Sequence, residues 1–105
     1  MSDNLPLTEQ YAKAAHEWVD AEAAASILED TKSSVLADMM GKLGDIAINR
    51  AEQQVKSSEE WRNHVISIVK ARETANRCKV KLEYLRMRFQ EWQSQEANNR
   101  IEARL

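Results

Sequence analysis

The chain has very little of what cross-links, kinks or interrupts a polypeptide. Its one cysteine, Cys78, excludes an intramolecular disulfide and a cysteine-based zinc site. One proline and two glycines are far below ordinary usage, which argues against a fold rich in turns. No apolar run approaches the length needed to cross a bilayer, and residues 1–7 lack the basic start and apolar core of a secretion signal. We therefore expect a cytoplasmic protein with no membrane partner.

What remains is the composition of long helices. Alanine, glutamate, lysine, arginine, glutamine and leucine dominate, and these residues are strong helix formers. One type of pattern runs through all 105 residues, so we expect no strands and a single domain over residues 1–105.

Apolar residues recur every seven positions along the C-terminal half, in two interleaved series. The first series is Trp61, Ile68, Ala75, Leu82 and Phe89, and the second is His64, Ala71, Cys78, Leu85 and Trp92. These series form the a and d positions of a heptad repeat, which we call the seam. The seam predicts one long helix over about 58–104 that packs against another helix.

A matching pair of series predicts the partner helix over about 8–40. Its members are Tyr11, Trp18, Ala25, Lys32 and Met39, with Ala14, Ala21, Leu28 and Val35 between them. The polar cluster at 31–34 leaves the register unchanged, so we expect one continuous helix. Gly41 and Gly44 stop this helix, and residues 41–57 form a connector. Asn49 with Glu52, and Ser57 with Glu60, resemble capping boxes, so the connector would hold a short helix from about Arg50 to Lys56.

Folded back antiparallel, the two helices match small residues with small and large with large. Ala25 lies near Ala75 and Tyr11 near Phe89, while residues beyond about Gln93 have no partner. The expected fold is all-α: an antiparallel, coiled-coil-like helical hairpin with one long C-terminal helix. Because a hairpin buries only one stripe per helix, and apolar residues also lie outside the seam, we expect a dimer that forms a helical bundle.

No residue pattern indicates catalysis or metal binding. His16 and His64 belong to no metal-ligand spacing. The turn from Gly41 to Gly44 lacks the preceding strand and the residue order of a phosphate-binding loop, and no serine, threonine or cysteine has both a general base and an orienting group gathered around it. We expect a protein that is not an enzyme and that uses no cofactor or metal.

The net charge of −2 conceals an uneven distribution. Residues 1–45 hold nine acids and three bases, whereas residues 46–105 hold twelve bases and eight acids. The candidate contacts for a protein partner or nucleic acid, which we call the basic ridge, are Lys70, Arg77, Lys79, Lys81, Tyr84, Arg86 and Arg88. The alternative acidic-face contacts are Asp20, Glu22, Glu29, Asp30 and Asp38. The ridge could bind phosphates, pair with the acidic first helix alongside it, or do both.

The segment Lys79-Val-Lys-Leu-Glu-Tyr-Leu-Arg-Met-Arg-Phe-Gln-Glu-Trp-Gln-Ser94, with the following Gln95-Glu96-Ala97, resembles the C-terminal part of small helical proteins of tailed bacteriophages and prophages. Those proteins are of uncharacterised role. The resemblance implies expression in the cytoplasm of a bacterial host, where such proteins often assist phage DNA recombination or replication, or inhibit host defence.

Three hypotheses of function follow. The first is a non-enzymatic helical oligomer that engages a host or phage protein in DNA recombination or replication. The second is an inhibitor of host defence, similar to an anti-CRISPR protein, whose acidic helix imitates nucleic-acid phosphates. The third is direct nucleic-acid binding through the basic ridge.

Overall fold

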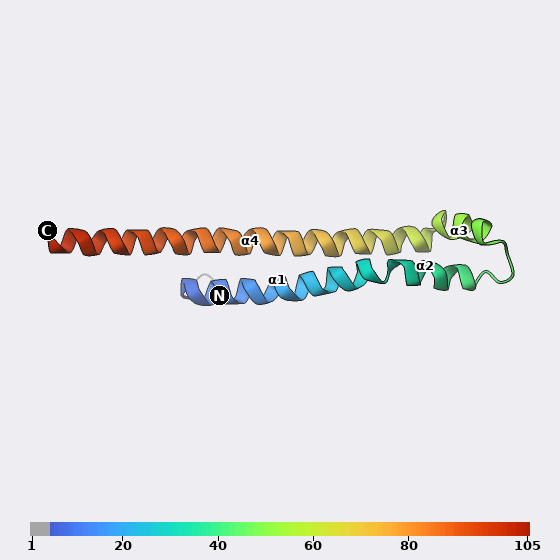
Figure 1. The fold of residues 1–105 in the computed structure, drawn as a ribbon, viewed down its shortest axis with the longest axis horizontal. Helices are drawn as coiled ribbons and strands as arrows, with labels where there is room; N and C mark the ends of the chain where they lie inside the picture. Colours follow the sequence, from blue (N-terminus) through green and yellow to red (C-terminus); the bar gives the residue numbers. More distant parts are fainter. Residues whose placement is uncertain (1–4) are drawn as a thin grey trace. The chain divides into compact units, whose positions relative to one another are not determined.

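The computed structural model describes residues 5–105, which contain four helices and no strand. The helices are α1 (Leu7–Asp30), α2 (Lys32–Gly41), α3 (Ile48–Lys56) and α4 (Glu59–Arg104), drawn in sequence colours in Figure 1. The all-α class and the long C-terminal helix are therefore confirmed. Part of the segment considered for a secretion signal, residues 1–4, lies outside the described residues. No helix of the described chain is long and apolar enough to span a membrane.

The expected first helix is interrupted at Thr31, between α1 and α2. The Thr31 hydroxyl donates a hydrogen bond to the Ile27 carbonyl at 2.7 Å, and Thr31 has φ −92° and ψ 0°. A threonine that bonds back to the preceding turn in this way commonly bends a helix. The prediction of one continuous helix over 8–40 was therefore wrong at this residue, although the apolar pattern resumes after it.

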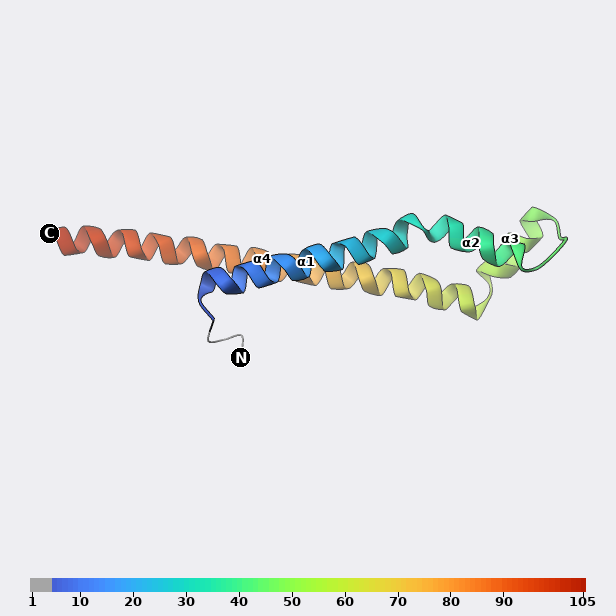
Figure 2. The ribbon, with the colours of Figure 1, turned by 90° about the horizontal axis from the view of Figure 1, so that it is seen from below.

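The connector has the expected parts in a slightly different register. α2 ends at Gly41, and Gly44 adopts a φ of +86°, a left-handed conformation that suits glycine. Figure 2 shows the turn by which the chain passes from α2 to α3. The short helix α3 is confirmed, but it begins after Ala47 without a side-chain cap, so the predicted box of Asn49 and Glu52 was wrong.

The cap of α4 is Ser58, one residue after the predicted Ser57. The Trp61 amide donates to the Ser58 hydroxyl oxygen at 3.2 Å, and that hydroxyl donates to the Val55 carbonyl at 2.6 Å. Ser58 therefore joins the end of α3 to the start of α4. The capping-box pattern of Ser57 and Glu60 did not reveal this role.

The chain divides into two compact units, one formed by residues 21–75 and the other by the residues before and after this range. In the unit of residues 21–75, Arg72 of α4 contacts Glu29 of α1, and Lys32 lies 6.0 Å from the ring centre of Trp61. From the first contact to the second, the residue number rises from 29 to 32 in the N-terminal segment and falls from 72 to 61 in α4, so the two segments run antiparallel. α2 packs against α3 in the same unit. Its buried apolar residues are Ala25, Ala51, Val55, Trp61, Ile68 and Ala75.

The second unit pairs the first half of α1 with α4 from Asn76 onward. Glu17 lies 3.6 Å from Lys81, and Tyr11 and Phe89 line one hollow, so these segments also run antiparallel. Ala14 and Leu85 are the buried apolar residues of this unit among those that the structure describes. The expected antiparallel pairing is therefore confirmed within each unit, and the single domain expected over residues 1–105 stays a prediction.

Candidate interaction surfaces

Two bases of α4 are neutralised by acids of α1. The Arg72 guanidinium donates to Glu29 at 2.6 and 2.9 Å and to Glu22 at 2.5 Å. These hydrogen bonds raise the pKa of Arg72 and, from the other side, lower the pKa of Glu29. Lys81 makes a longer contact with Glu17, at 3.6 Å. These residues flank the seam, where opposite charges set the register of paired helices.

All the bases of the basic ridge are exposed. Lys70, Lys79, Arg86 and Arg88 form no ion pair within residues 5–105. Of the predicted ridge contacts, Lys81 and Arg77 therefore already have interactions within the chain, and these four remain for a ligand or partner.

The acidic set is divided in the same way. Glu22 and Glu29 are held by Arg72, whereas Asp20, Asp30 and Asp38 are exposed. A surface that imitates nucleic-acid phosphates needs several carboxylates turned outward together. Two of the five candidate carboxylates are instead committed to a contact inside the protein.

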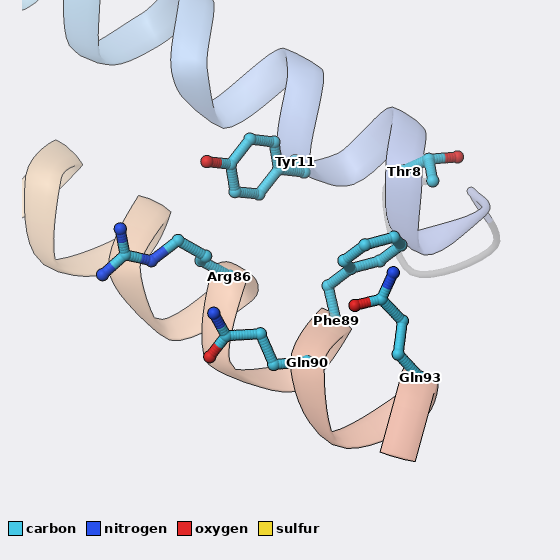
Figure 3. A pocket seen from close by; sticks show the side chains of 6 residues that line it. All are labelled: Thr8, Tyr11, Arg86, Phe89, Gln90 and Gln93. Carbon is cyan, nitrogen blue, oxygen red and sulfur yellow. The ribbon is translucent and has the colours of Figure 1, made fainter. Parts of the chain in front are cut away.

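Where the first turns of α1 meet α4, the structure has a partly open hollow of about 420 Å³ (Figure 3). We call it the aromatic hollow. Its lining residues are Thr8, Tyr11, Arg86, Phe89, Gln90 and Gln93. Figure 3 shows the Tyr11 and Phe89 rings on the α1 side of the two glutamine carboxamides. Arg86 is the only member that was predicted as a contact residue.

A second hollow of about 300 Å³ shares Thr8 and Phe89 with the first and continues to Trp92. The Phe89 and Trp92 rings are stacked, with centres 5.8 Å apart and planes inclined by 30°. Trp92 is 50 % exposed, so its predicted place in the packed seam was wrong. The physical reason is the start of α1 at Leu7: among residues 5–105, the first turn of α1 and Pro6 are what lies beside Trp92.

A signal for this site was present in the sequence. If Tyr11 lies opposite Phe89, an antiparallel register places the polar Thr8 opposite Trp92. The seam of α4 therefore continues beyond the apolar series of its partner. Gln90 and Gln93 carried no pattern of their own and could be assigned only from the geometry.

The face of α4 away from the seam carries a further apolar row. Val80, Tyr84 and Met87 are 65, 53 and 60 % exposed, and their i, i+4, i+7 spacing places them in one line along the helix. We call this row the outer stripe. Arg77, Lys81 and Arg88 follow one edge of it and Glu83 lies on the other, while Glu91, four residues after Met87, continues the line of the row itself.

The described residues offer no group of three or more metal-ligating side chains. His64 lies against the Trp61 ring, with centres 5.7 Å apart, and its Nε2 atom is buried without a hydrogen-bond partner. The single thiol, Cys78, is half-buried in the seam. These residues contribute to packing between the helices.

Comparison of the chain with protein-family models, with curated proteins and with solved structures finds no match. The interpretation of these surfaces therefore depends on their own chemistry.

Proposed function

We propose that the protein is a non-enzymatic interaction protein: a helical homo-oligomer that engages a protein partner in phage DNA recombination or replication, in the cytoplasm of the bacterial host. The observation that carries this proposal is the outer stripe. Contiguous apolar side chains exposed on the outside of a long helix are typical of surfaces that bind protein. The resemblance of residues 79–97 to small phage proteins supports the biological setting.

We propose a second copy of the chain as the occupant of the outer stripe, because a protein that buries few large side chains gains stability from association. Among residues 5–105, only Ala25 and Ala75 are completely inaccessible to solvent, and no large side chain is. A small helical protein with so little buried apolar surface gains stability by association, and symmetric dimers are the commonest form.

Charge selects the orientation of the two copies. In an antiparallel pair, equivalent edges of the stripe meet, so Arg88, which has no ion pair within residues 5–105, would face the basic edge of the second copy. In a parallel pair, opposite edges meet, and Glu83 faces Arg88 of the second copy twice over. The parallel arrangement therefore provides two symmetric ion pairs beside Tyr84 at the centre of the contact, while the two Glu91 carboxylates meet at the end of the row.

Light scattering on the full-length chain tests this arrangement. The wild type should have about twice the 12.1 kDa mass of one chain at micromolar concentration. Glu83→Arg and Arg88→Glu should each give monomers, whereas the double exchange should restore the dimer. Arg62→Glu, an equal charge reversal at an exposed position in the first turn of α4, is the matched control and should stay dimeric. A monomeric wild type, or dimers that tolerate either single reversal, would contradict the proposal.

The protein partner is tested separately, by affinity capture from lysate of phage-infected cells with and without nuclease. A partner protein should stay bound after nuclease treatment. Loss of every bound protein on nuclease treatment would show that nucleic acid makes the connection and would refute this part of the proposal.

A further inference from the structure

We propose that the aromatic hollow and its extension to Trp92 bind single-stranded nucleic acid, with one base at Tyr11 and Phe89 and the next at Trp92. This site is distinct from the outer stripe, and it is not the row of bases that the sequence indicated. Four of its features identify the ligand: the rings, the polar groups around them, the charge and the size.

The aromatic rings provide stacking surfaces. Tyr11 and Phe89 are half-buried and line the hollow, and the stacked pair of Phe89 and Trp92 continues the aromatic surface for a second position. Stacking on aromatic side chains is the usual way in which proteins hold unpaired bases, because every base has a flat face. In a duplex these faces are covered by neighbouring bases, so a single strand is required.

The polar groups around the hollow are better suited to bind the polar edges of a base than to bind an apolar side chain of a partner protein. Gln90 and Gln93 each carry a carboxamide that can both donate and accept, and Thr8 adds a hydroxyl. None of these three side chains forms a hydrogen bond within the described part of the chain. An apolar occupant would leave all of them without partners as it excluded water.

The charge favours an anion. Arg86 lines the hollow and has no acidic partner within residues 5–105, in contrast to Arg72 and Lys81 on the same helix. Among the described residues, no carboxylate lines either of the two hollows. A phosphate attached to the base at Tyr11 and Phe89 would therefore meet the Arg86 guanidinium. At Trp92, a neighbouring hollow carries Glu91, and Arg88 lines that hollow with it.

The size is also suitable. A volume of about 420 Å³ lies within the range of about 300–1,000 Å³ that is typical of pockets for small organic groups. The adjoining hollow of about 300 Å³ extends the site rather than forming a separate one, because Thr8 and Phe89 line both. Two adjoining hollows with aromatic rings suit two successive nucleotides, and base identity would matter little because stacking dominates.

Fluorescence anisotropy with the full-length protein tests the proposal, using a labelled oligothymidylate of about 15 nucleotides and its duplex with oligoadenylate. The wild type should bind the single strand at about 50 mM salt and prefer it to the duplex. Trp92→Ala should weaken binding roughly tenfold. We also expect binding to quench the tryptophan fluorescence of the wild type, and this quenching should be absent from the variant. Arg86→Gln should lower the slope of log Kd against log salt by about 0.7, the value for one phosphate contact with a single strand.

Arg62→Gln is the matched control for Arg86→Gln, since it removes the same charge from α4 outside the hollow, and it should bind like the wild type. No binding by the wild type, tighter binding of the duplex, or equal effects of the Arg62 and Arg86 variants would overturn the inference. If the hollow variants instead abolish capture of a protein partner and the oligonucleotide does not bind, the occupant is a protein and the inference fails. Val80→Ser, a substitution in the outer stripe that changes no charge and lies outside the hollow, should leave oligonucleotide binding within twofold of the wild type, so the outcome is independent of the proposed dimer.

Discussion

Arg72 illustrates how one residue can serve the fold rather than a ligand. Its planar guanidinium reaches Glu22 and Glu29 at once, and these two acids lie about two turns apart on the same face of α1. A base at this position was part of the same sequence cluster as the basic ridge, and composition alone could not separate the two roles. The distinction depends on whether the facing helix supplies an acid.

Replacing Arg72 should destabilise the pairing of α1 with α4. Arg72→Gln leaves Glu22 and Glu29 close together without a base between them, so we expect the thermal midpoint at neutral pH to fall by a few degrees. Arg72→Lys keeps the charge but not the fork of donors, and it should have a smaller effect. Circular dichroism melting curves of the three proteins provide the measurement. A midpoint for Arg72→Gln equal to that of the wild type would show that the network contributes nothing.

The same network predicts the effect of acid. The hydrogen bond from Arg72 lowers the pKa of Glu29 from its ordinary value of 4.5, although partial desolvation opposes this shift. A carboxyl with a lowered native pKa stabilises the fold above its unfolded pKa, and this contribution is lost as the pH falls through the native pKa. The difference in midpoint between wild type and Arg72→Gln should therefore be constant above about pH 5 and shrink toward about pH 3. A difference that grows on acidification would contradict this assignment.

At the level of the helices, the heptad series predicted which segments are helical and which faces meet. The seam contacts follow from the repeated positions of Ala25, Ala75 and Leu85, all of which are buried. The ends of helices were less predictable because they depend on single hydrogen bonds. Thr31 interrupts a pattern that continues on both sides, and Ser58 rather than Ser57 caps α4, which no periodicity can distinguish.

The two glycines of the connector have opposite requirements. Gly41 is the last residue of α2 and has open space where a Cβ would lie, so Gly41→Ala should stabilise the protein by about 0.5 kcal/mol through helix propensity. Gly44 has a φ of +86°, so Gly44→Ala should destabilise it by about 1 kcal/mol. Urea unfolding followed by circular dichroism measures both changes. A Gly44→Ala variant as stable as the wild type would show that the turn does not require the left-handed conformation, and a loss of stability in Gly41→Ala would show that the helix propensity at that position does not decide its effect.

Ser58 should be the more important of the two adjacent serines. Ser58→Ala removes the acceptor for the Trp61 amide and the donor to the Val55 carbonyl, and we expect a loss of about 1 kcal/mol in the free energy of unfolding. The Ser57 hydroxyl makes a single exposed bond to the Gln54 carbonyl, so Ser57→Ala is the control and should change stability by less than about 0.5 kcal/mol. Equal losses in the two variants would refute Ser58 as the cap.

At the level of the whole molecule, the sequence indicated the all-α fold but could not rank the surfaces. A heptad repeat assigns the seam, yet it gives equal weight to Phe89 and Trp92, of which Trp92 is half exposed because α1 begins too late to cover it. The outer stripe was recognised only as apolar residues outside the seam. Once the structure showed that the first helix covers the seam of α4, the remaining apolar residues could be recognised as one row with a basic edge and an acidic edge.

Association through the outer stripe should also change the stability of the protein with concentration. A dimer that unfolds to separate chains is stabilised by mass action, so the thermal midpoint of the wild type should rise by several degrees between micromolar and near-millimolar protein. Arg88→Glu, which removes the facing charge pair, should have a lower midpoint that does not depend on concentration. The double exchange of Glu83 and Arg88 should recover the concentration dependence. If the wild-type midpoint stays constant over this range, the folded chain does not need a second copy, and the outer stripe must have a different occupant.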